Sequence, residues 1–422
     1  MINIPKGTKD TLPQDSYKWQ YVESTVRRIA NYFGFREIRT PTFEYTELFL
    51  RGVGESTDIV DKEMYTFNDK GNRSISLRPE GTAGVARSYI ENSLENNGLP
   101  VKMYYIGPAF RYERPQSGRL REHHQFGAEL YGSPTPYADA QIISMAKMVL
   151  DTLGLQDVTL NINSIGCPKC RPNFDKAVRS YFETHIDSMC EVCKERLVKN
   201  PLRILDCKVP SCATIAEKAP SPADFLCDEC ASHQSQLINL LTDSNLEFKV
   251  NRHIVRGLDY YTKTVFEFVS TLIGAQGTVC GGGRYDNLTA SLGGKNTPAV
   301  GFGMGLERLL MVLAASNKFT GNPPAPELFI ISTNDNITKY AFRIAKKLRD
   351  LGISVETDLM NRSLKAQLKC ANKINAKYVI VLGDDEMTTN VVKLKNMQTG
   401  EEISLSLADI PCEMRSLLNS HF

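Results

Sequence analysis

The chain has 422 residues, of which 42% are hydrophobic and 23% are charged, as is ordinary for globular proteins. This length is enough for two or three domains with cores of their own. The formal net charge is only +2, so the overall charge does not indicate a nucleic-acid partner. The first residues lack a signal-peptide pattern, and no apolar run reaches the roughly 18 residues of a membrane helix. We therefore expect a cytoplasmic protein that has no membrane partner.

The first part of the chain alternates between helix and strand patterns. In chain order these predict a helix over residues 15–33, a strand over 33–44 stopped by Pro41, a hairpin over 64–82, a helix over 81–92, a long hairpin over 101–132, a helix over 136–154 and a strand over 157–164.

A cysteine-rich segment interrupts this pattern. Eight of the eleven cysteines fall between Cys167 and Cys230, so we predict an insertion over residues 165–232. Strand patterns then resume at 246–270 and 274–286, and PAVGFGMGLERLLMVLAA predicts a strand that leads into a helix. We therefore expect one core built from residues 1–164 and 233–320, with the insertion as a separate small domain.

The proline-rich connector NKFTGNPPAPE marks a second boundary. Beyond it, LFIIST, ISVETD and KYVIVLG predict strands that alternate with helical stretches. This βαβαβ order predicts a small α/β domain over residues 326–422, so the chain as a whole is expected to be of the α/β class.

The long hairpin carries polar groups on one face. The period of two along its second strand places Gln125, Gly127 and Glu129 on the same side, and Arg111 and Arg119 lie on or near its loop. Leaving such polar groups buried and unpaired costs about 1–3 kcal/mol each, so they should line a cavity or have partners. The alternative is an edge hairpin whose charges are solvated.

Three further segments combine arginine with glycine. RGLDYY places Arg256 at the mouth of a strand, where it should pair with an acid or meet an anionic ligand. GMGLERLL places Arg308 in a first helical turn, a position that favours anions, although a Glu307–Arg308 surface pair is the alternative. In CGGGRYD, three consecutive glycines indicate that another group packs against the backbone, with a bulge as the alternative.

Together these segments resemble a known family. FRYE, with the loop to Glu129, resembles motif 2 of class II aminoacyl-tRNA synthetases, GFGMGLERLL resembles motif 3, and FGFREIRTPTFE resembles the weaker motif 1. Within that class, LRPEGT, RGLDYY and GGGRYD resemble the histidyl-tRNA synthetases, and the likeness covers nearly the whole chain. It implies a cytoplasmic homodimer with an α+β catalytic core around a mainly antiparallel sheet, an inserted small domain and a C-terminal α/β domain that binds the anticodon.

The resemblance also implies the reaction, which is that of a histidine–tRNA ligase. The carboxylate of L-histidine attacks the α-phosphorus of ATP to give histidyl-adenylate and pyrophosphate, and histidine then passes to the 3′ end of its tRNA. Arg256 and Arg111 are the implied catalytic residues, holding the α-phosphate from opposite sides, while Mg²⁺ bridges the β- and γ-phosphates. The implied ATP-binding residues are Arg111, Glu113, Arg119, His123 and Arg308.

For the amino acid, the resemblance implies that Glu80 and Thr82 hold the α-amino group and that Gln125 bonds nearby. A site that pairs both imidazole nitrogens rejects isosteres by leaving buried groups unpaired. The implied histidine-binding residues are Glu80, Thr82, Gln125, Glu129, Arg256, Tyr260, Tyr261, Tyr285 and Gly303. His123 is a departure, because the family often has phenylalanine there, although a histidine ring also stacks on adenine.

The C-terminal part has a local excess of positive charge that the overall charge balance of the chain conceals. Residues 339–377 contain ten basic and three acidic side chains, an excess of seven positive charges. This pattern suits contacts with the phosphates of tRNA, and a solvated helix face is the alternative.

The eight clustered cysteines suit metal binding, because three of their four close pairs have C-x-x-C spacing. They would fill two tetrahedral four-cysteine Zn²⁺ sites of a structural kind, without the spacing indicating which four share an ion. The candidate ligands are Cys167, Cys170, Cys190, Cys193, Cys207, Cys212, Cys227 and Cys230. One alternative is an iron–sulfur cluster. The other is a set of scattered reduced thiols without metal, since many members of the family fold this insertion without a metal ion.

Two other functions are compatible with this class of fold. One is a non-catalytic paralogue that regulates histidine biosynthesis or senses tRNA, and the other is an unrelated nucleotide-dependent ligase. Arg111, Arg256, Arg308 and a full C-terminal domain are present, which favours the enzyme over a regulatory paralogue. RGLDYY and GGGRYD argue against the unrelated ligase.

Overall fold

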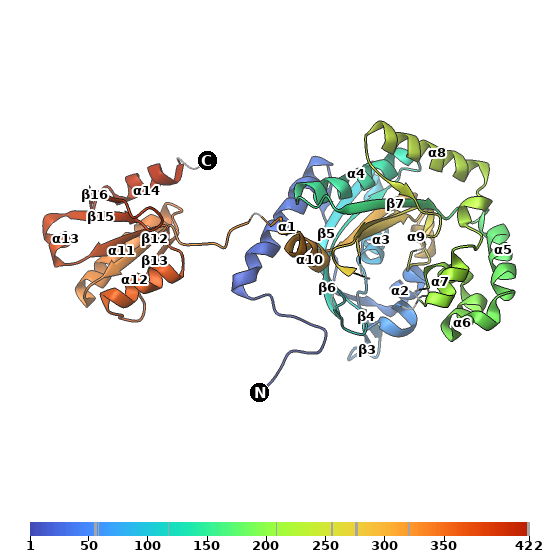
Figure 1. Ribbon diagram of the computed structural model, residues 1–422, viewed down its shortest axis with the longest axis horizontal. Helices are drawn as coiled ribbons and strands as arrows, with labels where there is room; N and C mark the ends of the chain where they lie inside the picture. The colour runs from blue at the N-terminus through green and yellow to red at the C-terminus, as the bar shows by residue number, and fades with distance from the viewer. Residues whose placement is uncertain are drawn as a thin grey trace. The chain divides into compact units, whose positions relative to one another are not determined.

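The computed structural model describes residues 1–54, 57, 59–116, 118–207, 209–254, 256–274, 277–319 and 321–419. The chain forms two compact units, Met1–Gly321 and Asn322–Phe422, which Figure 1 draws with a thin connector between them. Their boundary lies in the predicted proline-rich connector. Thr320 and residues 420–422, at the ends of the predicted domains, lie outside the described residues.

An eight-stranded sheet forms the centre of the first unit. Its order is β1 (Arg36–Glu37), β5 (Val101–Phe110), β6 (Glu122–Tyr131), β11 (Ala299–Gly305), β10 (Thr278–Arg284), β9 (Thr262–Ser270), β7 (Val158–Ser164) and β8 (Lys249–Val250). Only the end pairs β1–β5 and β7–β8 are parallel. The expectation of a mainly antiparallel sheet is confirmed, because most neighbours are joined antiparallel.

One face of this sheet is covered by four helices. They are α1 (Pro13–Tyr32), α4 (Pro136–Thr152), α8 (Asp228–Asp243) and α10 (Leu306–Ser316). Phe126, Ala128 and Leu130 alternate along β6 and join the core that these helices bury, with Val26 of α1 and Ile142 of α4 among its members. The opposite face of β6 is thereby left for Gln125, Gly127 and Glu129.

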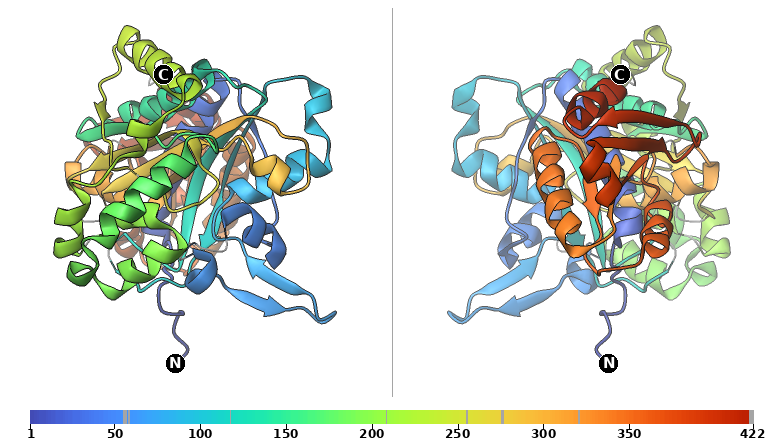
Figure 2. Two further views of the ribbon diagram at one scale, coloured as in Figure 1. Left: turned by 90° about the vertical axis from the view of Figure 1, so that its right-hand side faces the viewer. Right: turned by 90° about the vertical axis from the view of Figure 1, so that its left-hand side faces the viewer.

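The other face carries α2 (Thr46–Val53), α3 (Thr82–Glu91), α9 (Leu288–Ser291) and a small sheet of order β2 (Phe43–Tyr45), β4 (Ser74–Leu77) and β3 (Thr66–Asn68). The β3–β4 hairpin was predicted, and it extends away from the rest of its unit (Figure 2). The strand expected within 33–44 and stopped by Pro41 is present as β1, and β2, which follows the proline and belongs to the small sheet, was not predicted. Pro41 lies between them, and it has no N–H group with which to continue a ladder.

The cysteine-rich segment folds into short helices between β7 and β8. These are α5 (Arg171–Glu183), α6 (Glu191–Lys199) and α7 (Pro210–Ala216), followed by α8. The short helices η1 (Ile59–Glu63), η2 (Leu94–Asn97), η3 (Ile186–Ser188), η4 (Pro201–Asp206) and η5 (Pro222–Phe225) complete the unit. The segment has its own apolar cluster, which includes Phe174, Val178 and Ile204, but it belongs to the first compact unit.

The second unit is an α/β domain, as predicted. Its sheet has the order β13 (Val355–Thr357), β12 (Leu328–Ser332), β14 (Tyr378–Leu382), β15 (Val391–Asn396) and β16 (Glu402–Ser406). The first three strands are parallel, and the last two form an antiparallel extension that the sequence patterns did not predict. Its helices are α11 (Asp335–Asp350), α12 (Leu364–Lys373), α13 (Asp384–Thr389) and α14 (Ile410–Asn419). Across the described residues of both units, no helix is long and apolar enough to cross a membrane.

Candidate functional site

A cleft lies on the sheet face opposite the four covering helices. Gln125 of β6, Gly281 of β10 and Gly303 of β11 line it from the sheet, while Glu80 and Thr82 line it from the start of α3. Because β6 buries its apolar positions on the other side, its polar positions are directed to this face. The polar face of the hairpin is therefore part of a cleft, and the alternative of a solvated edge hairpin is wrong.

Two buried carboxylates meet at one end of the cleft. Glu80 accepts hydrogen bonds from the backbone N–H groups of Thr82, at 2.6 Å, and Ala83, at 2.8 Å. The Thr82 hydroxyl donates to Glu129 Oε1 at 2.8 Å, and the Tyr285 hydroxyl donates to Glu129 Oε2. Glu129 is completely buried. Thr82 therefore contacts both carboxylates at once.

These carboxyl groups hold protons more tightly than usual. Burial raises the pKa of Glu129 to about 8, against the opposing effect of the hydrogen bonds from Tyr285 and Thr82. Burial also raises the pKa of Glu80, and the N–H groups that it accepts from limit that rise. A ligand that brings a positive charge or N–H donors here would favour the ionised carboxylates. This end of the cleft is suited to a cationic or donor-rich group.

Glycines of β11 make room for this arrangement. A Cβ atom at Gly301 would lie 1.8 Å from Oε2 of Glu129, so only glycine allows that carboxylate to lie against the strand. A Cβ atom at Gly303 would meet only Gln125 Nε2, at 3.9 Å, so the floor of the cleft is open at that point.

Arg256 lies against the strand that contains the three consecutive glycines. Its Nη2 atom would be only 2.0 Å from a Cβ atom at Gly281, which confirms that a side chain packs directly on this backbone. Its Nη1 atom lies 3.3 Å from Glu267 Oε2. Its Nε atom is buried and has no hydrogen-bond partner among the described residues. Arg256 thus pairs with an acid, and it keeps a buried donor that no described residue satisfies.

Four arginines, Arg111, Arg119, Arg256 and Arg308, form a basic end of the cleft, and Arg111 links it to the carboxylates, because its Nε donates to the carbonyl oxygen of Pro79, beside Glu80, at 2.9 Å. Burial lowers the pKa of Arg308, and the charges of Arg119, Arg111 and Arg256 lower it further. Glu113 also lines this end, and its carboxylate lies 3.0 Å from Arg119 Nε. Such a concentration of guanidinium groups in a partly buried cleft is suited to a polyanion.

Arg308 and Glu307 both turn toward the site. Arg308 donates from Nη1 to the carbonyl oxygen of Thr278 at 2.6 Å and from Nε to that of Gly118 at 3.1 Å. Glu307 accepts from the His124 backbone N–H at 2.9 Å. Since both side chains are half-buried in these contacts, the alternative of a solvent-exposed pair is wrong.

His123 presents an uncharged ring to the basic end. Burial lowers its pKa to about 3, and the positive charges of Arg111 and Arg308 contribute to that shift. The ring is therefore neutral at physiological pH, and it lines the cleft beside the arginines. A flat, neutral ring at this position is suited to stacking against a base.

Most of the candidate residues line this cleft directly. They are Glu80, Thr82, Arg111, Glu113, Arg119, His123, Gln125, Arg256, Tyr260, Tyr261, Gly303 and Arg308. The other two, Glu129 and Tyr285, are buried and bonded to each other. Ten lining residues were not among the candidates, namely Tyr105, Gly118, Leu120, Leu258, Thr278, Val279, Cys280, Gly281, Gly305 and Glu307. The alternation of the long hairpin was a usable signal for Tyr105, because it is paired with Gly127 across β5 and β6.

Tyr260 and Tyr261 form one wall of the cleft. Their ring centroids are 4.7 Å apart, and Tyr260 packs edge-on against Tyr285 at 5.4 Å. Burial raises the pKa of Tyr261 to about 12, so its hydroxyl keeps its proton at neutral pH. The two rings and Tyr285 thus bring aromatic surface and hydroxyl groups to the carboxylate end.

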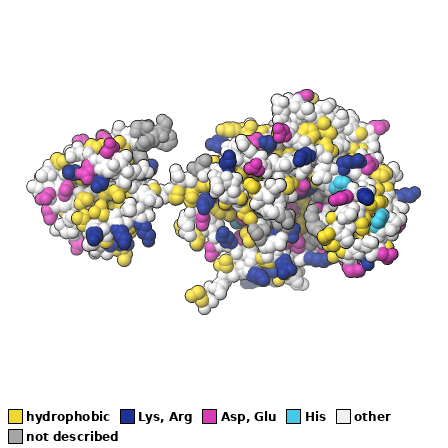
Figure 3. Space-filling model, viewed as in Figure 1, with side chains coloured by type: hydrophobic (Ala, Val, Ile, Leu, Met, Phe, Trp, Pro, Cys, Tyr) yellow, Lys and Arg dark blue, Asp and Glu magenta, His cyan; other side chains and the backbone are white. Residues whose placement is uncertain are grey.

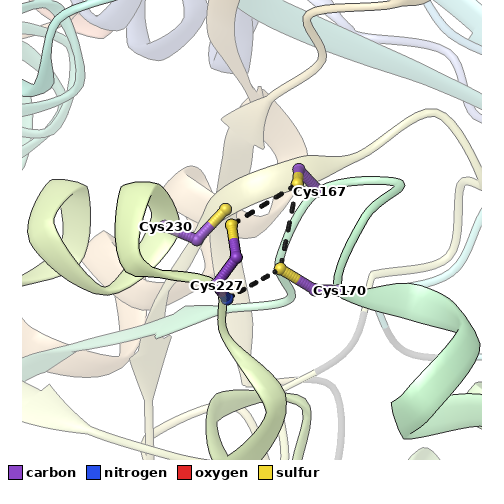
Figure 4. A group of neighbouring side chains, drawn as sticks. All are labelled: Cys167, Cys170, Cys227 and Cys230. Atoms are coloured by element: carbon purple, nitrogen blue, oxygen red, sulfur yellow. Dashed lines mark hydrogen bonds between the residues drawn. The ribbon is translucent and has the colours of Figure 1, made fainter.

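The eight candidate metal ligands lie outside this cleft in two groups. Cys167, Cys170, Cys227 and Cys230 form the first, which Figure 4 shows converging from two separate stretches of chain. The second group is Cys190, Cys193, Cys207 and Cys212. In each group the sulfur atoms all lie within 4.8 Å of one another. All eleven cysteines of the chain are free thiols.

Comparison with known proteins identifies relatives of this chain over nearly its whole length. The family model described as histidyl-tRNA synthetase matches residues 7–169 and 213–309, and the anticodon binding domain model matches 327–417. The histidine–tRNA ligase of Caldanaerobacter subterraneus is 53% identical over 97% of this chain and 98% of its own length. That of Acetivibrio thermocellus is 54% identical over 96% of this chain and 98% of its own length.

Solved structures give the same result. Apo histidyl-tRNA synthetase of S. aureus matches with a TM-score of 0.84 and 38% identity, covering 98% of this chain and all of that one. A protein titled ATP phosphoribosyltransferase regulatory subunit/histidyl-tRNA synthetase, from Bacillus halodurans, matches with a TM-score of 0.65 and 24% identity over 90% and 98% of the two chains. At that identity the second likeness concerns the fold alone.

Proposed function

The chain belongs to the histidyl-tRNA synthetase family, and from this premise we propose that it is a histidine–tRNA ligase. It activates L-histidine with ATP, releasing pyrophosphate, and transfers the histidyl group to the 3′ end of its tRNA. The relatives named histidine–tRNA ligase, which match over almost their whole length, support this assignment.

One observation supports the proposal at the level of individual residues, namely the distribution of charged side chains along the cleft. Two carboxylates and three tyrosines form one end of the cleft, Arg119 and Arg308 lie at the other, and Arg111 and Arg256 lie near both. An amino acid with an α-ammonium group and an imidazole suits the first end, and a triphosphate suits the second. The two reactants would then meet beside Arg256.

The chemistry follows from that placement. A carboxylate oxygen of histidine attacks the α-phosphorus of ATP, the new C–O–P linkage forms, and the bond to the pyrophosphate leaving group breaks. Both reactants are negatively charged, and charge builds on the non-bridging oxygens of the α-phosphate. A guanidinium group held on Gly281 supplies charge and bidentate donors at that point without having to reorganise. We assign this role to Arg256, with Arg111 on the opposite side.

At the two ends, the remaining residues position the substrates. Glu80 and Thr82 hold the α-ammonium group, and Gln125 bonds nearby. Glu129, Tyr261 and Tyr285 select the imidazole, because its two nitrogens require both a donor and an acceptor. Arg119 and Arg308 hold the distal phosphates, while His123 stacks on the adenine.

ATP is expected to bind with Mg²⁺, which neutralises charge on the β- and γ-phosphates. The carboxylate of Glu113 lines the phosphate end of the cleft and is the kind of oxygen ligand that Mg²⁺ prefers. We also propose structural Zn²⁺ in the cysteine groups, for which each group supplies four thiols.

A second groove is suited to the 3′ end of the tRNA. It shares Arg111, Glu113 and Arg119 with the cleft and continues along Lys62, Arg196 and Arg203. Arg203 donates from Nη1 to the carbonyl oxygen of Arg256 at 2.8 Å, so this wall also touches the proposed catalytic segment. Basic side chains along a groove that opens beside the adenylate are suited to a single-stranded phosphate backbone.

The second unit is proposed to read the anticodon. All ten basic residues counted between 339 and 377 are exposed. Lys365, Lys369 and Lys373 recur every four residues along α12 and therefore share one face, over which Figure 3 shows Lys and Arg side chains gathered. The matched anticodon binding domain supports the same assignment.

We further propose that two chains associate as a homodimer. The small sheet bears three exposed aromatic side chains, Phe43, Tyr45 and Phe67. Tyr45 and Phe67 both pair with Ile75, so they lie on one face of this sheet. An exposed apolar face of this kind marks a protein–protein contact.

The competing function is that of a regulatory paralogue. ATP–pyrophosphate exchange with each of the twenty amino acids, measured without tRNA, separates the two. Exchange with histidine alone, followed by aminoacylation of the cognate tRNA, is the expected result. A folded protein that binds histidine but catalyses no exchange would contradict the ligase assignment and favour the paralogue.

A further inference from the structure

The two cysteine groups have the spacing of tetrahedral metal sites. In the first group, Cys167 Sγ lies 3.8 Å from Cys170 Sγ and 3.9 Å from Cys227 Sγ. In the second, Cys190 Sγ lies 4.0 Å from Cys207 Sγ. Four sulfurs bound to zinc at about 2.3 Å stand about 3.8 Å apart along the edges of a tetrahedron. The sulfur positions therefore suit one ion in each group.

The hydrogen bonds and helix ends around the thiols also support metal binding. The Cys227 N–H donates to Cys170 Sγ at 3.2 Å, and the Cys190 N–H donates to Cys212 Sγ at 3.2 Å. Hydrogen bonds of this kind orient and stabilise ligating thiolates. Three of these cysteines also immediately precede helices, Cys170 before α5, Cys190 before α6 and Cys227 before α8. The positive ends of the helix dipoles are thereby directed toward sites that would carry negative charge.

The two groups differ in where they lie in the fold. Cys167 and Cys170 follow β7, where the chain leaves the large sheet, and Cys227 and Cys230 lie where it enters the helix that returns. The first group thus joins both ends of the insertion. The second group lies inside the insertion, where Cys193, Cys207 and Cys212 belong to its apolar cluster.

Residues next to the first two thiols in the chain are bonded to the wall of the histidine end of the cleft. Ile165 N–H donates to the carbonyl oxygen of Lys263 at 2.8 Å, and Lys263 N–H donates to that of Gly166 at 2.7 Å. Arg171, directly after Cys170, donates to the carbonyl oxygen of Tyr261 at 3.5 Å. The segment with the first two thiols is therefore bonded to the chain on both sides of Thr262.

A second cavity lies on the far side of that wall. Cys167, Tyr260 and Tyr261 all line it, together with Arg171. Tyr260 and Tyr261 line the main cleft as well. The two tyrosines therefore separate the substrate cleft from a cavity that the first cysteine group helps to enclose.

We propose that each cysteine group binds one Zn²⁺ and that the ion of the first group positions Tyr260 and Tyr261 for histidine binding. The second ion stabilises the insertion and the wall that Cys207 and Arg203 form in the groove proposed for tRNA, so its loss should affect transfer to tRNA more than histidine binding. The zinc assignment stands on the cysteine geometry alone, whereas the positioning role rests on the proposed ligase function. The cysteines are positioning residues, because none of the first group lines the main cleft.

The test compares matched serine variants of the full chain. Metal analysis of the purified protein should give about two zinc ions per chain, and about one for Cys227→Ser and for Cys190→Ser. Cys412, exposed in the second unit, supplies the control, since Cys412→Ser should retain both ions. Iron in place of zinc, or no metal in the folded wild-type protein, would overturn the metal assignment.

Exchange kinetics then separate the roles of the two ions. Cys227→Ser should raise the KM for histidine by about tenfold or more while the KM for ATP stays within about twofold. Cys190→Ser should leave both KM values near those of the wild type. Equal rises in the two variants, or an unchanged histidine KM in Cys227→Ser, would refute the positioning role.

Two further measurements guard against misfolding. Cys227→His keeps a zinc ligand at the same position and should restore the metal content and most of the histidine affinity. In a Cys280→Ser variant, which lacks the thiol that lines the cleft, a mercurial reagent should release zinc with a parallel loss of histidine binding, measured by calorimetry without turnover. Histidine binding that persists after complete zinc release would contradict the proposal.

Two zinc ions in a protein that lacks exchange activity would instead refute the ligase function, and the assignment of the two metal sites would remain.

Discussion

The Thr82 hydroxyl donates a 2.8 Å hydrogen bond to Glu129 Oε1, which connects the first turn of α3 to the cleft face of β6. Its own backbone N–H donates to Glu80 at 2.6 Å. One residue thus orients two carboxylates that are far apart in the sequence, and it does so at the wall of the cleft.

Thr82→Val keeps the shape of the side chain and removes only the hydroxyl donor. Glu129 would then have a buried oxygen without this partner, which costs about 1–3 kcal/mol. We expect the KM for histidine in ATP–pyrophosphate exchange to rise roughly tenfold, with a smaller change for ATP. Thr82→Ser keeps the donor and is the control. Equal kinetics for the valine and serine variants would show that the hydroxyl has no role in histidine binding.

Histidine binding should release a proton. Burial raises the pKa of Glu129 to about 8, so the empty protein holds this carboxyl group protonated at pH 7. A donor-rich ligand beside it favours the ionised form, and a reaction that releases a proton becomes more favourable as pH rises. Histidine affinity should therefore increase from pH 7 to 8, and calorimetry in buffers of different ionisation enthalpy should detect the released proton. Glu129→Gln should abolish the release; an unchanged release in that variant would assign it to another group.

Arg256→Ala should prevent adenylate formation while ATP and histidine still bind. Loss of one preorganised donor at a developing charge costs about 2.7–4 kcal/mol, so the single-turnover rate should fall by about a hundredfold to a thousandfold. Gly281→Ala is a matched probe, because its added Cβ would displace the same guanidinium group. Rapid-quench kinetics should show the same kind of defect for both variants. A variant that loses histidine binding but keeps its rate at saturation would contradict the assigned contact with the α-phosphate.

Arg284 is expected to act on stability, although it belongs to a segment characteristic of the family. It is fully buried, it pairs with Asp139 and lies 3.1 Å from Asp286, and it donates to the carbonyl oxygens of Ser133 and Thr135. Arg284→Ala leaves the buried Asp139 carboxylate without this partner, which should cost about 3–5 kcal/mol of unfolding free energy. Denaturant titration should measure this loss.

A double variant distinguishes the pair from general damage to the core. Arg284→Met combined with Asp139→Leu removes both charges, so it should be less destabilised than the sum of the two single variants. An additive result would mean that the two charges are not coupled.

The basic face of α12 should affect tRNA and leave amino-acid activation unchanged. Replacing Lys365, Lys369 and Lys373 by alanine should raise the KM for tRNA about tenfold and weaken its dependence on salt, because phosphate contacts are lost. The control is Lys393→Ala with Lys395→Ala, two exposed lysines of the same unit that lie near Glu402. Exchange with histidine should be unaffected in both variants, and equal losses of aminoacylation in both would refute a specific role for α12.

Local patterns predicted most elements of the fold. Alternation in VKMYYIGPAFRYER and HHQFGAELYG predicted β5 and β6, and the period of two placed Gln125 and Glu129 on one face, because side chains of a strand alternate. The stop at Pro41 was predicted, but the pattern did not show that the chain continues after it as a strand of a second sheet. The extension by β15 and β16 was missed, although its strands pair as a simple hairpin.

Sequence by itself determined the family, the residue types of the site and the division of the chain into a core and a C-terminal α/β unit. These depend on motifs and periodicities that local chain geometry imposes. It also showed that eight cysteines belong to one segment. It did not show how they combine, because C-x-x-C spacing fixes each pair and says nothing about which pairs meet.

Tertiary structure alone decided the long-range contacts. It joined Cys167 and Cys170 with Cys227 and Cys230, placed Arg256 on Gly281, and buried Glu129 while leaving Gln125 at the cleft. Each of these contacts depends on how separate strands and helices pack, which no single stretch of sequence encodes. The environment that raises the pKa of Glu129 exists only once the sheet, α3 and the tyrosines have come together.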